Sequence, residues 1–265
     1  MNTRTVNSVE LALIDRGTGP AVVLVHGFPL DHSIWNEQID VLAADHRVIA
    51  PDLRGFGRSG VTDDDTITMQ RLADDLAGLL DALELHEPIV FCGLSMGGYV
   101  AFEFQRKYGD RLRGLILCDT RAAGDTAEKA VGRREMAERV LREGPEPLVD
   151  AMTPLLFAPE TVANRPELVE SLLRVMRGTD RRTIAAGLRG MADRPNATSA
   201  LPTIDCPTLV LAGRFDVLTP PEEMREIAAA IPAAHYVEIP AAGHISPMEN
   251  PAEVNAAMLT FLAGL

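Results

Sequence analysis

Phe91-Cys92-Gly93-Leu94-Ser95-Met96-Gly97-Gly98 is the stretch that decides the fold. It follows a short apolar run at 88–90 and precedes an amphipathic run at 99–108, so a Gly-x-Ser-x-Gly pattern lies between a buried strand and a helix. That setting is typical of a nucleophile elbow. A serine in so sharp a turn needs unusual backbone angles, and the flanking glycines leave room for the neighbouring strand and helix. An ordinary glycine-rich turn also fits the pattern alone, so the rest of the chain must decide.

The composition is that of a globular protein. With 265 residues, 46% of them hydrophobic and 24% charged, the chain suits one α/β domain with an insertion. No apolar run approaches the ~20 residues of a membrane span, and residues 1–7 lack the apolar core of a signal peptide. We therefore expect a cytoplasmic protein. Cys92, Cys118 and Cys206 show neither paired nor metal-ligand spacing and are interpreted as small core residues.

The net charge of −13 disfavours two classes of partner. Nucleic acids and anionic membrane surfaces would both repel the chain at long range. The same charge places little restriction on a small neutral substrate, and the oligomeric state is not readable from the sequence.

Strand and helix patterns alternate outward from the elbow on both sides. Continuous apolar runs such as 21–25 are typical of strands covered on both faces, whereas 9–14 alternates enough to be an edge strand. Apolar residues three and four apart between 69 and 83 indicate a helix. The alternation predicts a mostly parallel, doubly wound sheet.

Residues 122–199 interrupt this alternation and show only helical patterns. Asp125-x-x-Glu128 is interpreted as a capping box that opens the first of these helices. We expect 1–121 and 200–265 to form the core domain and 122–199 to be a helical cap inserted over the strand ends. Most of its apolar residues would dock the helices onto the body. We expect three side chains to line the pocket: Trp35, Met136 and Phe157.

Ser95, Asp216 and His244 each come just after a different predicted strand, in the order Ser, Asp, His. The carboxyl ends of parallel strands line the ligand crevice of an open sheet, so the three can meet in space. Ser95 would attack an acyl carbon, His244 would take and return its proton, and Asp216 would orient the imidazole. Asp119, which follows another strand, is an alternative for the acid, although Asp216 lies in the better-matched segment.

Two backbone N–H groups are suited to bind the oxyanion of a tetrahedral intermediate. One belongs to Met96, directly after the serine, and the other to Phe28 in the loop 26–29. His26 is interpreted as a residue that braces this loop. No metal-ligand spacing and no phosphate-binding loop is present, so we expect neither a metal nor another cofactor.

Taken together, several segments resemble the serine-dependent α/β-hydrolase superfamily, in particular its small esterases, 3-oxoadipate enol-lactonase-like enzymes and carbon–carbon bond hydrolases. The segments are HGFP at 26–29, DLRGFGRSG at 52–60, GLSMGG at 93–98, GRFDVLTP at 213–220 and GHISPMENP at 243–251. By position, the resemblance implies Ser95 as nucleophile, Asp216 as acid, His244 as base, and Phe28 and Met96 as oxyanion donors. Haloalkane dehalogenases and epoxide hydrolases are similar but carry aspartate at the elbow, so Ser95 argues against both.

The expected activity is hydrolysis of a small, apolar carboxylic ester or lactone through an acyl-enzyme. Carbon–carbon bond hydrolysis and perhydrolysis are alternatives that the same residues would support. A ligand-binding receptor that keeps the hydrolase shell is an alternative of another class, which an intact Ser95, Asp216 and His244 disfavour.

Overall fold

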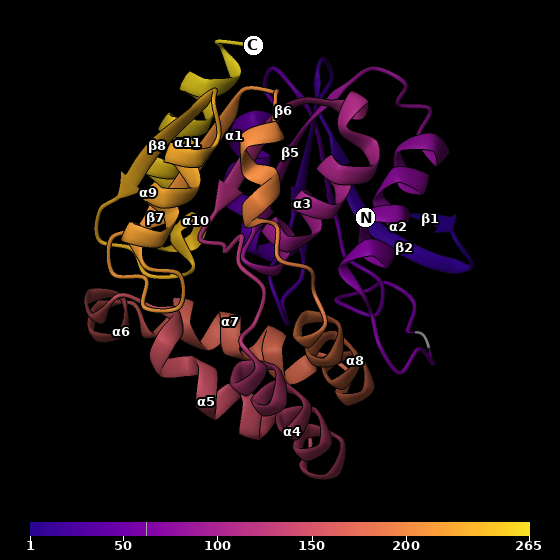
Figure 1. Ribbon diagram of the computed structural model, residues 1–265, viewed down its shortest axis with the longest axis vertical. Helices are drawn as coiled ribbons and strands as arrows, with labels where there is room; N and C mark the ends of the chain where they lie inside the picture. Colours follow the sequence, from indigo (N-terminus) through magenta and orange to yellow (C-terminus); the bar gives the residue numbers. More distant parts are fainter. Residues whose placement is uncertain (62) are drawn as a thin grey trace.

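The computed structural model describes residues 1–61 and 63–265, and its centre is an eight-stranded sheet (Figure 1). The strands follow the order β1-β2-β4-β3-β5-β6-β7-β8. Neighbours from β4 to β8 pair in parallel, and β1–β2 and β2–β4 pair antiparallel. The bounds are β1 Asn2–Val6, β2 Val9–Arg16, β3 Ala21–Val25, β4 Arg47–Pro51, β5 Ile89–Leu94, β6 Leu112–Cys118, β7 Thr208–Gly213 and β8 Ala234–Ile239.

Helices cover both faces of the sheet, and alternate residues of each inner strand contact one layer or the other. On β5, Phe91 packs in the cluster that includes α2, α3 and α9, whereas Val90 packs with α1 and α11. Because side chains alternate across a strand, such double burial requires a continuous apolar run. The helices on the two faces are α1 Asn36–Leu42, α2 Met69–Ala82, α3 Met96–Tyr108, α9 Pro221–Ala230 and α11 Pro251–Leu262.

The edge of the sheet differs from the sequence-based prediction. β2 is not an edge strand, because β1 pairs with it in register from Asn2 opposite Leu13 to Val6 opposite Val9. The side chains of Asn2–Thr5 are exposed, so this edge strand lacks the apolar pattern by which strands are usually detected.

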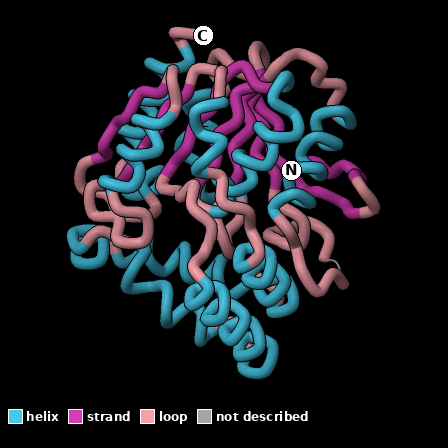
Figure 2. The backbone as a smooth tube through the Cα atoms, viewed as in Figure 1, coloured by secondary structure: helices cyan, strands magenta, loops and turns pink. Residues whose placement is uncertain are grey.

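Five further helices gather beyond one end of the sheet (Figures 1 and 2). The first of them, α4, begins after the N-cap Thr126, whose hydroxyl accepts a hydrogen bond from Lys129 N–H at 3.2 Å. The expected capping box at Asp125 is therefore wrong, since that carboxylate instead pairs with two arginines. The helices are α4 Ala127–Glu143, α5 Glu146–Leu156, α6 Pro159–Asn164, α7 Pro166–Gly178 and α8 Arg181–Ala192.

The three cysteines are buried and unbridged, as small core residues would be. Over the described ranges 1–61 and 63–265, no helix combines the length and apolar character that crossing a bilayer requires.

Candidate active site

Ser95 lies between β5 and α3 with backbone angles that few residues other than glycine adopt, at φ 51° and ψ −111°. The turn is crowded on its sheet side, because a Cβ on Gly97 would lie 2.3 Å from the carbonyl oxygen of Val25. Thr120 braces the turn, its hydroxyl donating to the Ser95 carbonyl at 2.7 Å. A strained serine conformation held from several sides is characteristic of a functional turn.

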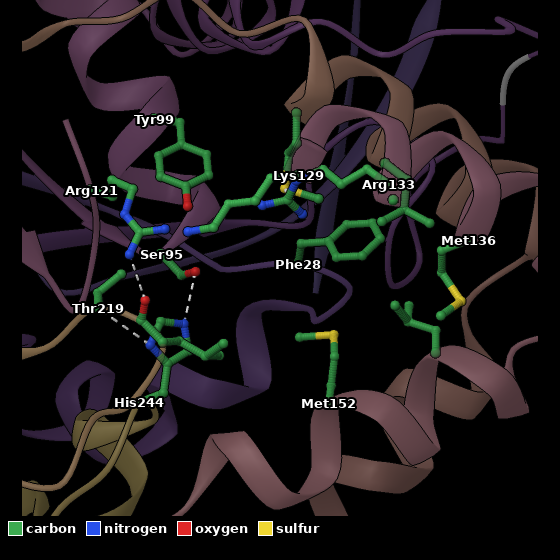
Figure 3. Close-up of a pocket in the computed structure, with 15 residues that line it drawn as sticks. Phe28, Ser95, Tyr99, Arg121, Lys129, Arg133, Met136, Met152, Thr219 and His244 are labelled. Atoms are coloured by element: carbon green, nitrogen blue, oxygen red, sulfur yellow. Dashed lines mark hydrogen bonds between the residues drawn. The ribbon is translucent and has the colours of Figure 1, made fainter. Parts of the chain in front are cut away.

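The structure brings Ser95, Asp216 and His244 together from the loops that follow three different strands. Figure 3 shows the contact between Ser95 and His244 at the cavity. His244 Nε2 lies 2.9 Å from Ser95 Oγ, and His244 Nδ1 lies 2.8 Å from Asp216 Oδ2. In the tautomer protonated at Nδ1, the ring donates to Asp216 and accepts from the Ser95 hydroxyl. Asp216 is itself held by Thr219, whose backbone N–H and hydroxyl both donate to its carboxylate.

The sequence Thr219-Pro220-Pro221-Glu222 predicts a helix that Thr219 caps, but the structure gives this residue another role. The N-cap of α9 is Pro220, and Thr219 Oγ1 lies 2.5 Å from Asp216 Oδ2. The Thr219 hydroxyl therefore donates to the candidate acid and does not cap α9.

Burial and charge act in opposite directions on the imidazole of His244. Burial disfavours its charged form, but the charge of Asp216 and the hydrogen bond to it hold the pKa of His244 above the ordinary value. Burial likewise opposes ionisation of Asp216, yet His244 and the donors of Thr219 hold the pKa of that carboxyl below its ordinary value. The site is thus arranged to stabilise an imidazolium beside a carboxylate.

Asp119, the alternative acid, is a second buried carboxyl close to the first. Its Oδ1 accepts from Gly213 N–H at 2.6 Å, and its Oδ2 lies 2.5 Å from the Ser246 hydroxyl. It makes no hydrogen bond with His244 among the residues described. Burial and the nearby charge of Asp216 raise the pKa of Asp119 to about 8, so this group is mainly neutral at pH 7.

Asp119→Asn is expected to stabilise the fold increasingly as pH rises from 5 to 8, with no further gain above. The folded state holds the Asp119 proton up to about pH 8, whereas an unfolded carboxyl releases it near pH 4. As pH rises from about 4 to about 8, the free energy of unfolding of the wild type therefore loses the contribution of Asp119, on the order of a few kcal/mol. Asparagine cannot ionise, and it keeps one acceptor and one donor for Gly213 and Ser246.

The measurement is urea unfolding of wild type and variant at pH 5, 7 and 9. Asp150→Asn, which changes an exposed carboxylate on α5, is the control. A stability difference between Asp119→Asn and wild type that stays constant or shrinks as pH rises would contradict the raised pKa.

The predicted oxyanion donors are the N–H groups of Met96 and Phe28, which come from two segments next to Ser95. Met96 is the first residue of α3, and Phe28 lies in the loop after β3. Within the described part of the chain, neither N–H donates to a backbone or side-chain acceptor. The loop approaches closely, because a Cβ on Gly27 would lie 3.3 Å from Ser95 Cβ. Both donors thus remain available to a ligand beside the serine.

His26 braces the loop that carries Phe28. Its Nε2 accepts from Leu53 N–H at 3.0 Å and its Nδ1 lies 2.8 Å from the Gly27 carbonyl, which fits a neutral ring protonated at Nδ1. Burial lowers the pKa of His26, in keeping with that neutral form. The ring therefore joins the loops at 26–29 and 52–60.

Asp31, His32 and Asp52 form a group whose ligand atoms lie within 4.8 Å of one another, close enough to hold a cation. Protein donors already bond three of the four carboxylate oxygens, namely both of Asp52 and Oδ1 of Asp31. Asp52 accepts from the backbone N–H and the Nδ1 of His32 and from Arg58 N–H, while Asp31 accepts from the Ser33 backbone and hydroxyl. These hydrogen bonds indicate that the three residues hold together the two chain segments that carry them.

A cavity of about 310 Å³ opens at Ser95 and His244. Met136 lines it, as expected, but Trp35 and Phe157 do not. Trp35 is fully buried and lies with Phe157 in the cluster that packs on the α1 and α11 face of the sheet. The expectation for these two residues is therefore wrong, since Trp35, directly before α1, and Phe157, directly after α5, both pack in the core instead.

The cavity is not uniformly apolar. Phe28, Leu148 and Met152 contribute apolar surface, and Tyr99, Arg121, Lys129 and Arg133 add polar and cationic groups (Figure 3). Sequence reasoning missed these four. A usable signal was present at two of them, because Lys129, Arg133 and Met136 follow one another on one helical face at spacings of four and then three.

The loop that carries His244 is fastened to the end of α5. His244 N–H donates to the Leu156 carbonyl at 2.9 Å. The buried carboxylate of Glu249 accepts from Ala158 N–H and from Gly243 N–H, each at 2.7 Å. The candidate base is thus held jointly by the sheet and by the helical segment.

The sheet order and the strand–elbow–helix unit at Ser95 define an α/β-hydrolase fold. The sequence profile of the alpha/beta hydrolase family matches residues 22–257, and the chain belongs to that family. A thermophilic esterase from Thermogutta terrifontis, solved with malate bound, is 49% identical with a TM-score of 0.96, covering 99% of this chain and 98% of its own. The enol-lactonase from Burkholderia xenovorans LB400 is 30% identical, with a TM-score of 0.91 and coverage of 99% and 100%. A bromoperoxidase from Bacillus anthracis is 25% identical, with a TM-score of 0.87 and coverage of 99% of each chain.

Proposed function

We propose that this protein is a serine hydrolase that cleaves a carboxylic ester or a lactone through an acyl-enzyme. The observation that carries the proposal is the hydrogen-bonded series from the Ser95 hydroxyl through His244 to Asp216, which opens into the cavity. Similarity to chains named as an esterase and an enol-lactonase supports the ester and lactone class.

In the first half-reaction Ser95 Oγ attacks the acyl carbon while its proton passes to His244 Nε2. Asp216 stabilises the resulting imidazolium, which suits the raised pKa of His244. The carbonyl oxygen becomes an oxyanion that the N–H groups of Phe28 and Met96 bind. Collapse of this intermediate breaks the bond to the leaving oxygen, which takes the proton from His244.

In the second half-reaction His244 removes a proton from water, and the hydroxide formed attacks the acyl-enzyme. The same donors bind the second oxyanion. Its collapse releases the acid and returns the proton to Ser95. We also propose that the helices of residues 122–199 act as a cap, since α4 and α5 supply Met136 and Met152 to the cavity wall.

Perhydrolysis is a second candidate, favoured by the similarity to a chain named as a bromoperoxidase. Hydrogen peroxide would then replace water as the attacking nucleophile, and the product would be a peracid. Hydrolysis of a carbon–carbon bond would use the same three residues. Product analysis of a common substrate panel, with and without peroxide, separates the three reactions.

A p-nitrophenyl alkylphosphonate is expected to inactivate the enzyme with release of about one equivalent of nitrophenolate per chain, because an activated serine attacks phosphorus and cannot be freed by water. The measurement pairs the released chromophore with residual esterase activity and peptide mass analysis. The expected adduct lies on the peptide that contains Ser95. Turnover of esters by a protein whose adduct forms on another residue would contradict the proposal, and binding of esters without any turnover would favour the ligand-binding alternative.

A further inference from the structure

One side of the cavity carries three cationic side chains and a phenol, close to the candidate nucleophile. Tyr99 lies one helical turn after Ser95 on α3, Arg121 follows β6, and Lys129 and Arg133 come from the first two turns of α4. In Figure 3 the Lys129 side chain extends toward the part of the cavity where Tyr99 and Arg121 lie. These groups belong to different elements, so their convergence is a property of the assembled site.

The two arginines are held in place by carboxylates. Arg121 donates from Nε and Nη2 to the two oxygens of Glu223, at 2.6 and 2.8 Å. Arg133 Nε donates to Asp125 Oδ2 at 2.5 Å, and Asp125 also pairs with Arg194 at 2.8 Å. Such pairing fixes the guanidinium groups at the cavity wall. Each group has five N–H donors, and the carboxylates take only some of them.

Lys129 differs from both arginines. Among residues 1–61 and 63–265 its ammonium group has neither a salt-bridge partner nor a hydrogen-bond acceptor. It is also the third residue of α4, where the helix dipole disfavours a cation. Lys129 is an exposed residue that lines the cavity, so its ammonium group is free to pair with a ligand that brings negative charge.

The charge balance points the same way. Three cations line the cavity, Arg121, Lys129 and Arg133, and Arg194 shares Asp125 with Arg133. Against these four positive charges stand the carboxylates of Glu223, Asp125 and Asp216, which leaves a local charge of +1. The whole chain carries −13. A positive region inside so acidic a protein attracts an anion specifically to this cavity.

Tyr99 adds a donor to the same side. Its ring is held under the guanidinium of Arg194, whose Cζ lies 4.3 Å from the ring centroid. Tyr99 lines the cavity, and no hydrogen bond of its hydroxyl is seen within the described residues. A phenol and an ammonium group that line the same cavity can each donate to one oxygen of a carboxylate.

We propose that Lys129, with Tyr99, Arg121 and Arg133, binds a free carboxylate of the substrate, so that the enzyme acts on esters or lactones that carry a second, ionised acid group. This inference rests on the proposed function and narrows its substrate class. A carboxylate has a single negative charge, which matches the single positive charge of the Lys129 ammonium group. The apolar side of the cavity, with Phe28, then receives the hydrocarbon part of the substrate.

The test compares Lys129→Met with wild type on pairs of esters that differ in charge alone. The first pair is mono-p-nitrophenyl glutarate and p-nitrophenyl valerate, in which the acyl chain carries or lacks the carboxylate. The second pair is the butyrate ester of 3-hydroxypropanoate and propyl butyrate, which moves the carboxylate to the alcohol side. Only the pair whose carboxylate reaches Lys129 should respond, and this identifies the side of the ester that carries the acid group. In that pair, Lys129→Met is expected to raise the KM of the charged ester relative to the KM of the neutral ester about tenfold, the usual size of a charge-assisted hydrogen bond.

Arg142→Met is the matched control, because it removes one positive charge from an exposed position of the same helix. It should leave both KM ratios as in wild type, whereas Lys129→Arg should keep most of the preference. Added salt should weaken the preference in wild type and have little effect in Lys129→Met. KM ratios that are the same in Lys129→Met and wild type for both pairs would overturn the inference while leaving the proposed function intact.

Binding measurements keep the two proposals separate. If no ester is hydrolysed in a Ser95-dependent way, the proposed function fails, but calorimetry of glutarate with Ser95→Ala still tests the carboxylate site. Adding Lys129→Met to that background should raise the Kd for glutarate about tenfold. An unchanged Kd, or no measurable binding to either protein, would overturn the inference.

Discussion

Ser95→Ala is expected to lower kcat for an activated ester by about 10⁶-fold, the loss seen when the nucleophile of a serine hydrolase is removed. Without the hydroxyl, His244 has no proton to accept from the elbow, and water would have to attack the substrate directly. The oxyanion donors and the cavity remain, so substrate affinity should change little. Steady-state kinetics with p-nitrophenyl butyrate and equilibrium binding of a product acid measure the two quantities.

Two comparisons make this expectation specific. Ser199→Ala removes an exposed hydroxyl distant in sequence from the site and should match wild type. Urea unfolding of Ser95→Ala should give a free energy of unfolding at least that of wild type. The loss of kcat then does not come from a loss of the fold. Ser95→Ala retaining a tenth or more of wild-type kcat would exclude the acyl-enzyme mechanism.

Asp216→Asn is expected to lower kcat by about 10⁴-fold, because it inverts the hydrogen bond to His244. Asp216 Oδ1 accepts from Leu218 N–H and Thr219 N–H, at 2.8 and 3.0 Å, and the asparagine carbonyl would keep these bonds. Its amide group would then face His244 Nδ1 as a donor. The imidazole would have to carry its proton on Nε2, where it can no longer accept the proton of Ser95.

The measurement is kcat and KM for the same ester, with Asp119→Asn as the matched control. Asp119 is also a buried carboxyl near the site, but its oxygens bond Gly213 and Ser246. A larger loss of kcat in Asp119→Asn than in Asp216→Asn would reverse the two roles and make Asp119 the acid.

The convergence of Ser95, Asp216 and His244 could be predicted because topology fixes it. Each residue follows a strand, and parallel strands bring their carboxyl ends to one edge of a sheet, whatever the side chains between them. The elbow was recognisable for the same reason, since glycines at close approaches leave a mark in the sequence. The helices of residues 122–199 were detectable by their apolar spacing.

Features set by tertiary packing could not be predicted. Trp35 and Phe157 are apolar at positions where the cavity wall and the core have the same chemistry, and only the packed structure separates them. Thr219 had the sequence of a helix cap, but its hydroxyl bonds the candidate acid. The cationic side of the cavity combines Tyr99 of α3, Arg121 after β6 and two residues of α4, so the local pattern on α4 contains only part of it.

The attachment of the His244 loop to α5 has a consequence for how such enzymes diversify. Leu156 and Ala158 contact the chain around His244 through hydrogen bonds that also involve Glu249. A helical segment transplanted from a relative would therefore have to bring a compatible junction at 156–158, or the imidazole would lose part of its anchorage. Recombination within this family is thus expected to tolerate exchange of α4 and α8 more readily than of the α5–α6 corner.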